Sequence, residues 1–318
     1  LVSARQTERE YDIEERDGTF YILTNADGAE DFKIMTAPVA TPDADHWTEL
    51  VPHTPGVLIL DIILLKHHLV RLERFEGLPR IVVRELETGK EWTVKFDEEA
   101  YSLGMSAGFE FDTRTIRFTY SSPTTPSRTY DLDLATGERT LLKEQEVPSG
   151  HNPADYETKR IFATAPDGER VPVTLLYRKG LKLDGSAPAL LYGYGAYGIA
   201  MPASFSVSKL SLVDRGVVYA TAHVRGGMDK GYAWYRNGRR EHKTNTFTDF
   251  IAAAETLIEL GYTSKGRIVA EGGSAGGLLM GAVANMRPDL WAGIIAEVPF
   301  VDVLNTMLDD TLPLTPPE

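Results

Sequence analysis

A short glycine-rich segment at residues 272–277, Gly-Gly-Ser-Ala-Gly-Gly, constrains this chain more than any other feature. The apolar run at 268–270 before it is typical of a buried strand, and residues 276–286 after it have helical character. A serine between a strand and a helix sits on a sharp turn, where side chains larger than glycine at neighbouring positions would clash. The segment therefore predicts that Ser274 is a nucleophile and that the backbone N–H of Ala275 stabilises an oxyanion. The alternative is a glycine-rich turn that only packs.

The residues around this segment alternate between expected strands and helices. A hairpin is expected at 160–177, followed by strands at 188–192, 217–224 and 294–298. Apolar residues from Phe247 to Ile258 recur with a helical period, and Thr246 with Asp249 resembles a capping box at the start of that helix. Alternation of this kind predicts a parallel sheet with helices on both faces, so we assign residues 151–318 to an α/β domain.

Residues 1–150 have a different pattern, in which short apolar runs alternate with turn sequences and no long helix is expected. Strands are predicted at 20–23, 80–83 and 115–118. A weak repeat, Leu-Glu-Thr-Gly-Lys and Leu-Ala-Thr-Gly-Glu, has copies that start 48 residues apart, at 86 and 134. Since a propeller blade takes about 40–50 residues, each copy would be the turn between the two outer strands of a blade. The repeat alone leaves a β-propeller and a β-sandwich open, and residues 148–157 are the expected linker.

Composition narrows the classes of function. The net charge of −13 argues against a nucleic-acid partner, because a phosphate backbone requires a basic surface. It suits a cationic ligand, although solubility is the simpler explanation. The chain has no cysteine and no apolar run of about 18 residues, so disulfides, thiolate chemistry and a membrane span are not expected.

The two ends of the chain resemble cut ends. The chain starts at Leu1 without a signal-like segment and stops at Glu318 without a closing helix, so we interpret it as an internal fragment. The lack of cysteines fits a reducing compartment. We therefore expect a cytoplasmic location and leave the periplasm open.

A second motif, Tyr-Gly-Tyr-Gly-Ala-Tyr-Gly at 192–198, directly follows an expected strand. In hydrolases of this fold, the loop after an early strand supplies a second oxyanion donor, and a neutral tyrosine hydroxyl can donate such a hydrogen bond. On its own, the motif favours the alternative, aromatic packing beside flexible glycines.

Together with these two motifs, several segments resemble the prolyl oligopeptidase family of serine peptidases. They are His-Val-Arg-Gly-Gly at 223–227, Asn-Thr-Phe-Thr-Asp-Phe at 245–250 and Arg-Pro-Asp-Leu at 287–290. The stretch 298–315 is most similar to the oligopeptidase B subgroup. The resemblance is specific over 150–318 and looser over 1–150. It implies the front half of an α/β-hydrolase catalytic domain, preceded by the last blades of the family's seven-bladed propeller.

The resemblance implies a role for four residues. Ser274 matches the serine that is acylated, while the Ala275 N–H and the hydroxyl of Tyr194, rather than Tyr192, match the oxyanion donors. Glu318 falls where oligopeptidase B carries the first of two glutamates that hold a substrate arginine or lysine, the alternative being a solvated chain end. The implied activity is hydrolysis of oligopeptides after Arg or Lys through an acyl-enzyme. The implied enzyme needs no cofactor, and its propeller excludes large folded proteins.

Three positions depart from the subgroup's pattern. Pro202 and Ser204 stand where oligopeptidase B often carries two aspartates, which puts a preference for paired basic residues in doubt. Asp229 stands where relatives tend to have a glutamate.

His67 and His68 do not suggest a metal, since adjacent residues in a strand point to opposite faces and no third ligand is near.

The larger departure concerns the catalytic base. In this fold the triad follows the order Ser, Asp, His, yet every histidine precedes Ser274 and the aspartates after it come too early. These residues are His46, His53, His67, His68, His151, His223 and His242, and Asp302, Asp309 and Asp310. We therefore expect an inactive fragment of an active parent, with His223 structural. The alternatives are a prolyl peptidase, another α/β-hydrolase such as an esterase, and a non-catalytic interaction protein.

Overall fold

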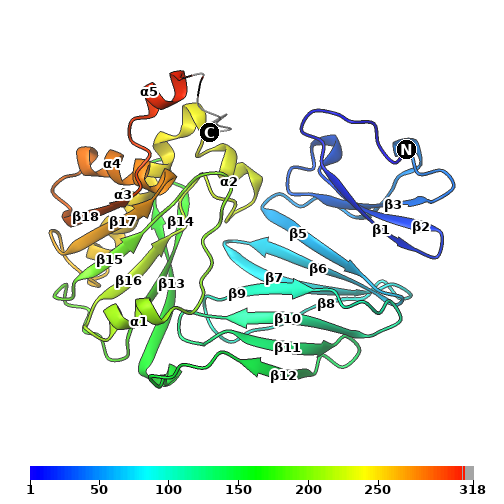
Figure 1. The fold of residues 1–318 in the computed structure, drawn as a ribbon, viewed down its shortest axis with the longest axis horizontal. Coiled ribbons are helices and arrows are strands. Elements are labelled where there is room, and N and C mark those ends of the chain that lie inside the picture. The colour runs from blue at the N-terminus through cyan, green and yellow to red at the C-terminus, as the bar shows by residue number, and fades with distance from the viewer. Residues whose placement is uncertain (310, 312–318) are drawn as a thin grey trace.

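The computed structural model describes residues 1–309 and 311, and it divides into two parts (Figure 1). Three four-stranded antiparallel sheets are built from residues 11–144, and a six-stranded sheet with flanking helices is built from residues 156–297. Between these two parts, residues 145–155 contain only one short 3-10 turn, Pro153–Asp155. Both expected classes of sheet are therefore present, and the boundary placed at residue 150 stays a prediction.

Each small sheet is a meander in which strands follow one another in chain order. The first holds β1 (Tyr11–Arg16), β2 (Thr19–Thr24), β3 (Lys33–Pro38) and β4 (Thr48–Val51). The second holds β5 (Val57–Leu64), β6 (His68–Phe75), β7 (Leu78–Glu85) and β8 (Glu91–Thr93). The third holds β9 (Ser102–Ser106), β10 (Thr115–Ser121), β11 (Arg128–Asp133) and β12 (Arg139–Glu144).

The repeated Thr-Gly turns join the third and fourth strands of two successive sheets, as the repeat predicts. Gly89 and Gly137 both have positive φ, and each closes a turn by donating its N–H to Glu85 and Asp133 respectively. Buried apolar side chains of neighbouring sheets pack face to face, for example Val70 and Ile81 against Ile116 and Phe118. Three such sheets in series are blades of a propeller rather than the two layers of a sandwich.

The larger sheet has the strand order β13-β14-β16-β15-β17-β18. It begins with the predicted hairpin, β13 (Tyr156–Thr164) and β14 (Arg170–Arg178), and β14 pairs antiparallel with β16 (Val218–Ala222). From β16 onward the neighbours β15 (Ala189–Tyr192), β17 (Ile268–Gly273) and β18 (Trp291–Glu297) are parallel. In a parallel sheet the loops at the carboxyl ends of the strands share one edge, so the loops after β15 and β17 meet there.

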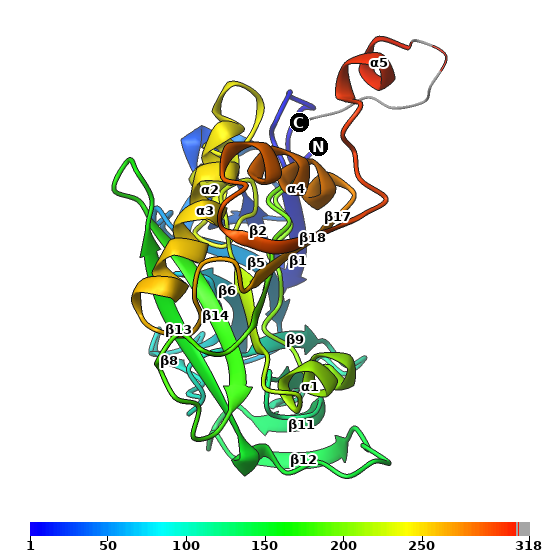
Figure 2. The ribbon, with the colours of Figure 1, turned by 90° about the vertical axis from the view of Figure 1, so that its left-hand side faces the viewer.

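Helices cover both faces of this sheet (Figures 1 and 2). α3 (Thr244–Glu259) and α4 (Ala275–Met286) pack on one face, where Leu175, Leu191 and Ala220 contribute to the buried core. The alternate residues Leu176, Leu190 and Tyr219 point to the other face, against α1 (Val207–Val213).

The structure corrects one expectation about helices and adds three helices that were not expected. Thr246 lies inside α3 rather than at its N-terminus, and its hydroxyl donates to the carbonyl oxygens of Arg225 and Gly238, so it does not form a capping box. The short helices α1, α2 (Tyr232–Arg236) and α5 (Val303–Leu308) were not predicted. Along the described part of the chain, no helix is both long enough and apolar enough to cross a bilayer.

Candidate active site

Ser274 occupies a sharp turn between β17 and α4, as the glycine-rich segment predicts. Its backbone has φ 55° and ψ −115°, a conformation that a residue with a side chain rarely adopts. The Ser274 N–H donates to the carbonyl oxygen of Glu297 at 2.9 Å, and its own carbonyl oxygen accepts from the N–H groups of Gly277 and Phe300. These bonds hold the turn, while the Ser274 side chain is exposed at the end of the sheet.

Close backbone packing explains the glycines around Ser274. A Cβ atom at Gly272 would lie 2.5 Å from the carbonyl oxygen of Gly276 and 2.9 Å from that of Gly193. A Cβ atom at Gly276 would lie 2.7 Å from the same Gly193 oxygen. The turn around Ser274 therefore packs directly on the loop that follows β15, and alanine at either glycine would push the two apart.

The loop after β15, residues 193–198, is called the tyrosine loop below. It brings Tyr194 to the serine turn, since the Tyr194 Cα and ring both lie 3.4 Å from the position of a Cβ at Gly276. Tyr192 instead ends β15 on the opposite face of the sheet, where it packs near Leu190 and Tyr219. The geometry thus favours Tyr194 over Tyr192 as an oxyanion donor.

Ala275 is the first residue of α4 and is buried. The first N–H groups of a helix have no partner within the helix and carry the positive end of its dipole. An oxyanion formed at Ser274 would therefore meet the amide of Ala275 on one side and the tyrosine loop on the other.

Backbone hydrogen bonds join the tyrosine loop to the loop at 225–228. The Gly198 N–H donates to the Gly226 carbonyl oxygen at 2.9 Å, and the Met228 N–H donates to the Gly198 carbonyl oxygen at 3.1 Å. Gly195 has φ +73°, and a Cβ there would lie 2.4 Å from the Thr246 side chain. The loop is thus fixed between the segment after β16 and helix α3.

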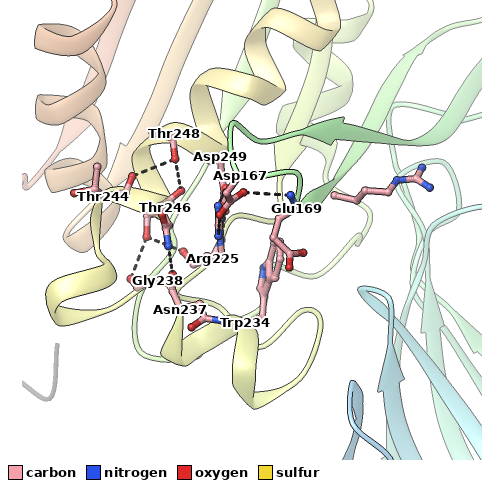
Figure 3. Close-up of polar contacts among 12 residues, drawn as sticks. Asp167, Glu169, Arg225, Trp234, Asn237, Gly238, Thr244, Thr246, Thr248 and Asp249 are labelled. Atoms are coloured by element: carbon pink, nitrogen blue, oxygen red, sulfur yellow. Dashed lines mark hydrogen bonds and ion pairs between the residues drawn. The ribbon is translucent and has the colours of Figure 1, made fainter.

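A buried ion pair anchors this support (Figure 3). Arg225 is 3% exposed, and its guanidinium donates to both oxygens of the Asp249 carboxylate, at 2.9 and 2.6 Å. It also pairs with Asp167, and this hydrogen bond lowers the pKa of the Asp167 carboxyl. The Trp234 ring lies beside the guanidinium, 5.6 Å from its central carbon. Arg225 therefore joins the hairpin, α2 and α3 behind the tyrosine loop.

Ionisable groups also lie under the serine turn, on the face of the sheet that α1 covers. Burial raises the pKa of the Glu271 carboxyl, with a further contribution from Glu297. Burial lowers the pKa of the Lys209 ammonium, which lies 4.7 Å from the centre of the Tyr219 ring. Sequence analysis missed this group, because an isolated Glu and Lys give no motif.

A pocket of about 180 Å³ adjoins Ala275. Its walls are mostly apolar, with two cationic side chains: Ala196, Tyr197, Arg240, Lys243, Ala275, Leu278, Phe300, Val303 and Met307. The Lys243 ammonium donates to the Gly195 carbonyl oxygen at 2.6 Å, so it also holds the tyrosine loop. Within residues 1–309 and 311 the lining contains no carboxylate, and Glu318, the predicted substrate-binding residue, lies outside the described residues.

None of the described hydrogen bonds joins a histidine to Ser274. His223, which directly follows β16, is buried between Thr174 at 2.8 Å and Asp229 at 2.9 Å. Both ring nitrogens are engaged, which fits its predicted structural role. The described residues also contain no cluster of three or more side chains able to hold a metal ion.

The order of the large sheet and the serine turn between β17 and α4 define an α/β hydrolase that follows propeller blades. Family comparisons agree: the model described as "Prolyl oligopeptidase family" matches residues 203–318, and "Prolyl oligopeptidase, N-terminal beta-propeller domain" matches residues 1–145. The chain belongs to the prolyl oligopeptidase family of serine peptidases.

Individual relatives agree with this assignment. Dipeptidyl aminopeptidase BI of Pseudoxanthomonas mexicana is 46% identical over 316 residues, which are 99% of this chain and 43% of that protein. Oligopeptidase B of Leishmania major superimposes with a TM-score of 0.90 at 39% identity, covering 99% of this chain and 45% of that one. Oligopeptidase B of Trypanosoma brucei, with covalently bound antipain in a closed form, gives 0.91 at 40% identity, covering 99% and 46%. The chain thus spans less than half the length of these relatives.

Proposed function

We propose that the protein carrying this chain is a serine oligopeptidase that cleaves small peptides through an acyl-enzyme at Ser274. The left-handed Ser274 turn, packed directly on the tyrosine loop, is the observation that carries the proposal. In this mechanism Ser274 Oγ attacks the peptide carbonyl, and the Ala275 N–H and the Tyr194 hydroxyl bind the oxyanion. Acylation needs a base to accept the serine proton, and we propose that this base lies outside the 318 residues.

We further propose a preference for arginine or lysine before the cleaved bond, provided by Glu318 and a second carboxylate outside this chain. The net charge of −13 supports a cationic substrate, because a negative surface steers positive ligands inward. Arg240 and Lys243 line the pocket beside Ala275 and would repel a cationic substrate. The proposed carboxylates must therefore attract the substrate more strongly than these two side chains repel it. The cytoplasmic location stays a prediction.

Release of dipeptides from a free N-terminus is the second candidate function. It is favoured by the 46% identity to a protein named dipeptidyl aminopeptidase. The two activities differ in one respect: an exopeptidase requires the substrate's free α-amino group, whereas an endopeptidase accepts a blocked one.

The test uses the full-length gene product and one series of peptide p-nitroanilides. N-terminally blocked substrates ending in Arg, Lys, Pro or Gly are compared with the same peptides carrying a free N-terminus, and Ser274→Ala is the control. We expect blocked Arg and Lys substrates to exceed blocked Pro and Gly in kcat/KM by at least about 100-fold, the order that a buried charged pair supports. Turnover of blocked Pro alone contradicts the proposed specificity, and activity restricted to free N-termini favours the second candidate.

A further inference from the structure

A buried carboxylate of the first propeller blade reaches into the hydrolase part. Asp31 precedes β3 and is 1% exposed. Its carboxylate accepts from the N–H of Gly56, in its own propeller, and from the N–H of Tyr232, the first residue of α2, both at 2.6 Å. The contact to Tyr232 spans 201 residues of sequence. A buried carboxylate that accepts from two backbone amides is a strong, charge-assisted contact.

The chain around α2 is shaped to admit this carboxylate. Gly231 has φ +89°, and a Cβ there would lie 2.5 Å from one oxygen of Asp31, so only glycine lets the side chain approach. The neighbouring Glu30 pairs with Arg236 at the other end of α2, but its carboxylate is 27% exposed and that of its partner 51%. Asp31 is therefore the buried anchor of this contact and Glu30 the solvent-facing one.

Helix α2 in turn holds the segment that supports the tyrosine loop. The Gly226 N–H donates to the Trp234 carbonyl oxygen at 3.1 Å, and the Trp234 indole donates to the His223 carbonyl oxygen at the same distance. Gly226 and Met228 then bond to Gly198 from both sides, as described above. Hydrogen bonds connected by short backbone segments thus run from Asp31 through α2 and 226–228 to the tyrosine loop.

We propose that Asp31 is a positioning residue through which the docked propeller sets the tyrosine loop, and with it Tyr194. Without the Asp31 carboxylate, the N–H at the start of α2 loses its acceptor. The hydrogen bonds from α2 to Gly226, and then those from 226–228 to Gly198, weaken as a result. The role given to Tyr194 rests on the proposed function, but the state of the loop does not, so the two are testable separately.

The test is amide hydrogen exchange on this chain, comparing wild type with Asp31→Asn. The amide of asparagine has nearly the same size, but its NH₂ group faces one of the two N–H donors, which leaves that donor unsatisfied. We expect exchange at the amides of Gly198, Gly226 and Met228 to accelerate about tenfold or more, while the β13–β14 hairpin remains unchanged. Glu30→Gln is the matched control and should leave all of these rates at wild-type values.

A purely local role gives a different result. If Asp31→Asn accelerates exchange only at its direct partners, Gly56 and Tyr232, and leaves the tyrosine loop protected, the proposal is wrong. If Asp31→Asn unfolds the chain, Tyr232→Pro replaces it, since proline is tolerated at the first position of a helix and removes the N–H that donates to Asp31. Acceleration at Gly198 and Gly226 in that variant supports the proposal, and unchanged rates there overturn it.

Discussion

Ser274 is held in a conformation that opposes its own preference. A sparsely populated backbone conformation of this kind costs a residue with a side chain about 1–3 kcal/mol, so the surrounding contacts must impose it. Backbone hydrogen bonds do so: the Ser274 N–H donates to Glu297, and the N–H groups of Gly277, Leu278 and Phe300 donate to the Ser274 carbonyl oxygen. Strain that the fold enforces at one exposed serine is typical of a nucleophile.

At the scale of residues, the sequence indicated which residues form the serine turn but not which distant residues contact it. The glycines at 272–277 predicted the serine turn because Gly272, Gly276 and Gly277 each make a close approach that a side chain would prevent. Nothing in the sequence indicated that Phe300 closes the turn or that Arg240 and Lys243 line the adjoining pocket, since these contacts depend on how distant segments pack.

Gly276→Ala tests the contact between the serine turn and the tyrosine loop. The added Cβ would lie 2.7 Å from the Gly193 carbonyl oxygen, so we expect the loop to move and the chain to lose about 1–3 kcal/mol of unfolding free energy. In the full-length enzyme, kcat should fall about tenfold or more as Tyr194 shifts. Gly293→Ala is the control, because a Cβ there meets nothing within 4 Å. Equal urea midpoints for Gly276→Ala and wild type contradict the packing described here.

At the scale of elements, the hydrophobic pattern predicted the long helix and the buried strands but missed the short helices. The apolar period of α3 and the apolar runs of β15 and β17 are strong local signals, and these elements lie where they were expected. α1 and α2 have only 7 and 5 residues, too few for a period to show. Thr246 and Asp249 looked like a local cap, but both side chains bond to Arg225, a tertiary contact that outweighs local preference.

Asp249→Asn tests the ion pair that connects α3 to the segment after β16. The substitution leaves the buried Arg225 guanidinium short of its bidentate partner, so we expect a loss of roughly 3 kcal/mol or more in unfolding free energy by urea denaturation. Asp289→Asn, which breaks the solvent-exposed pair with Arg287, is the control and should change stability little. If the two variants lose similar amounts of unfolding free energy, the claim that burial makes the Arg225–Asp249 pair important is wrong.

At the scale of the whole molecule, the sequence separated two domains by composition and turn frequency but did not show how they dock. The 48-residue repeat left a propeller and a sandwich open, and only the packing of three successive meanders decided between them. Contacts such as Asp31 with Tyr232 join residues that no local pattern relates. The interface is therefore the part of the molecule for which a structure was needed.

The claim that Ser274 is the nucleophile of a peptidase whose base lies outside these residues is tested most directly with a fluorophosphonate probe. The 318-residue chain, the full-length protein and its Ser274→Ala variant are labelled in parallel, and the adduct is mapped by peptide mass spectrometry. We predict one rapid, stoichiometric adduct at Ser274 in the full-length protein, none in the variant, and labelling of the 318-residue chain slower by at least about 1,000-fold. An adduct at another residue, or equally rapid labelling of the 318-residue chain, would contradict the account.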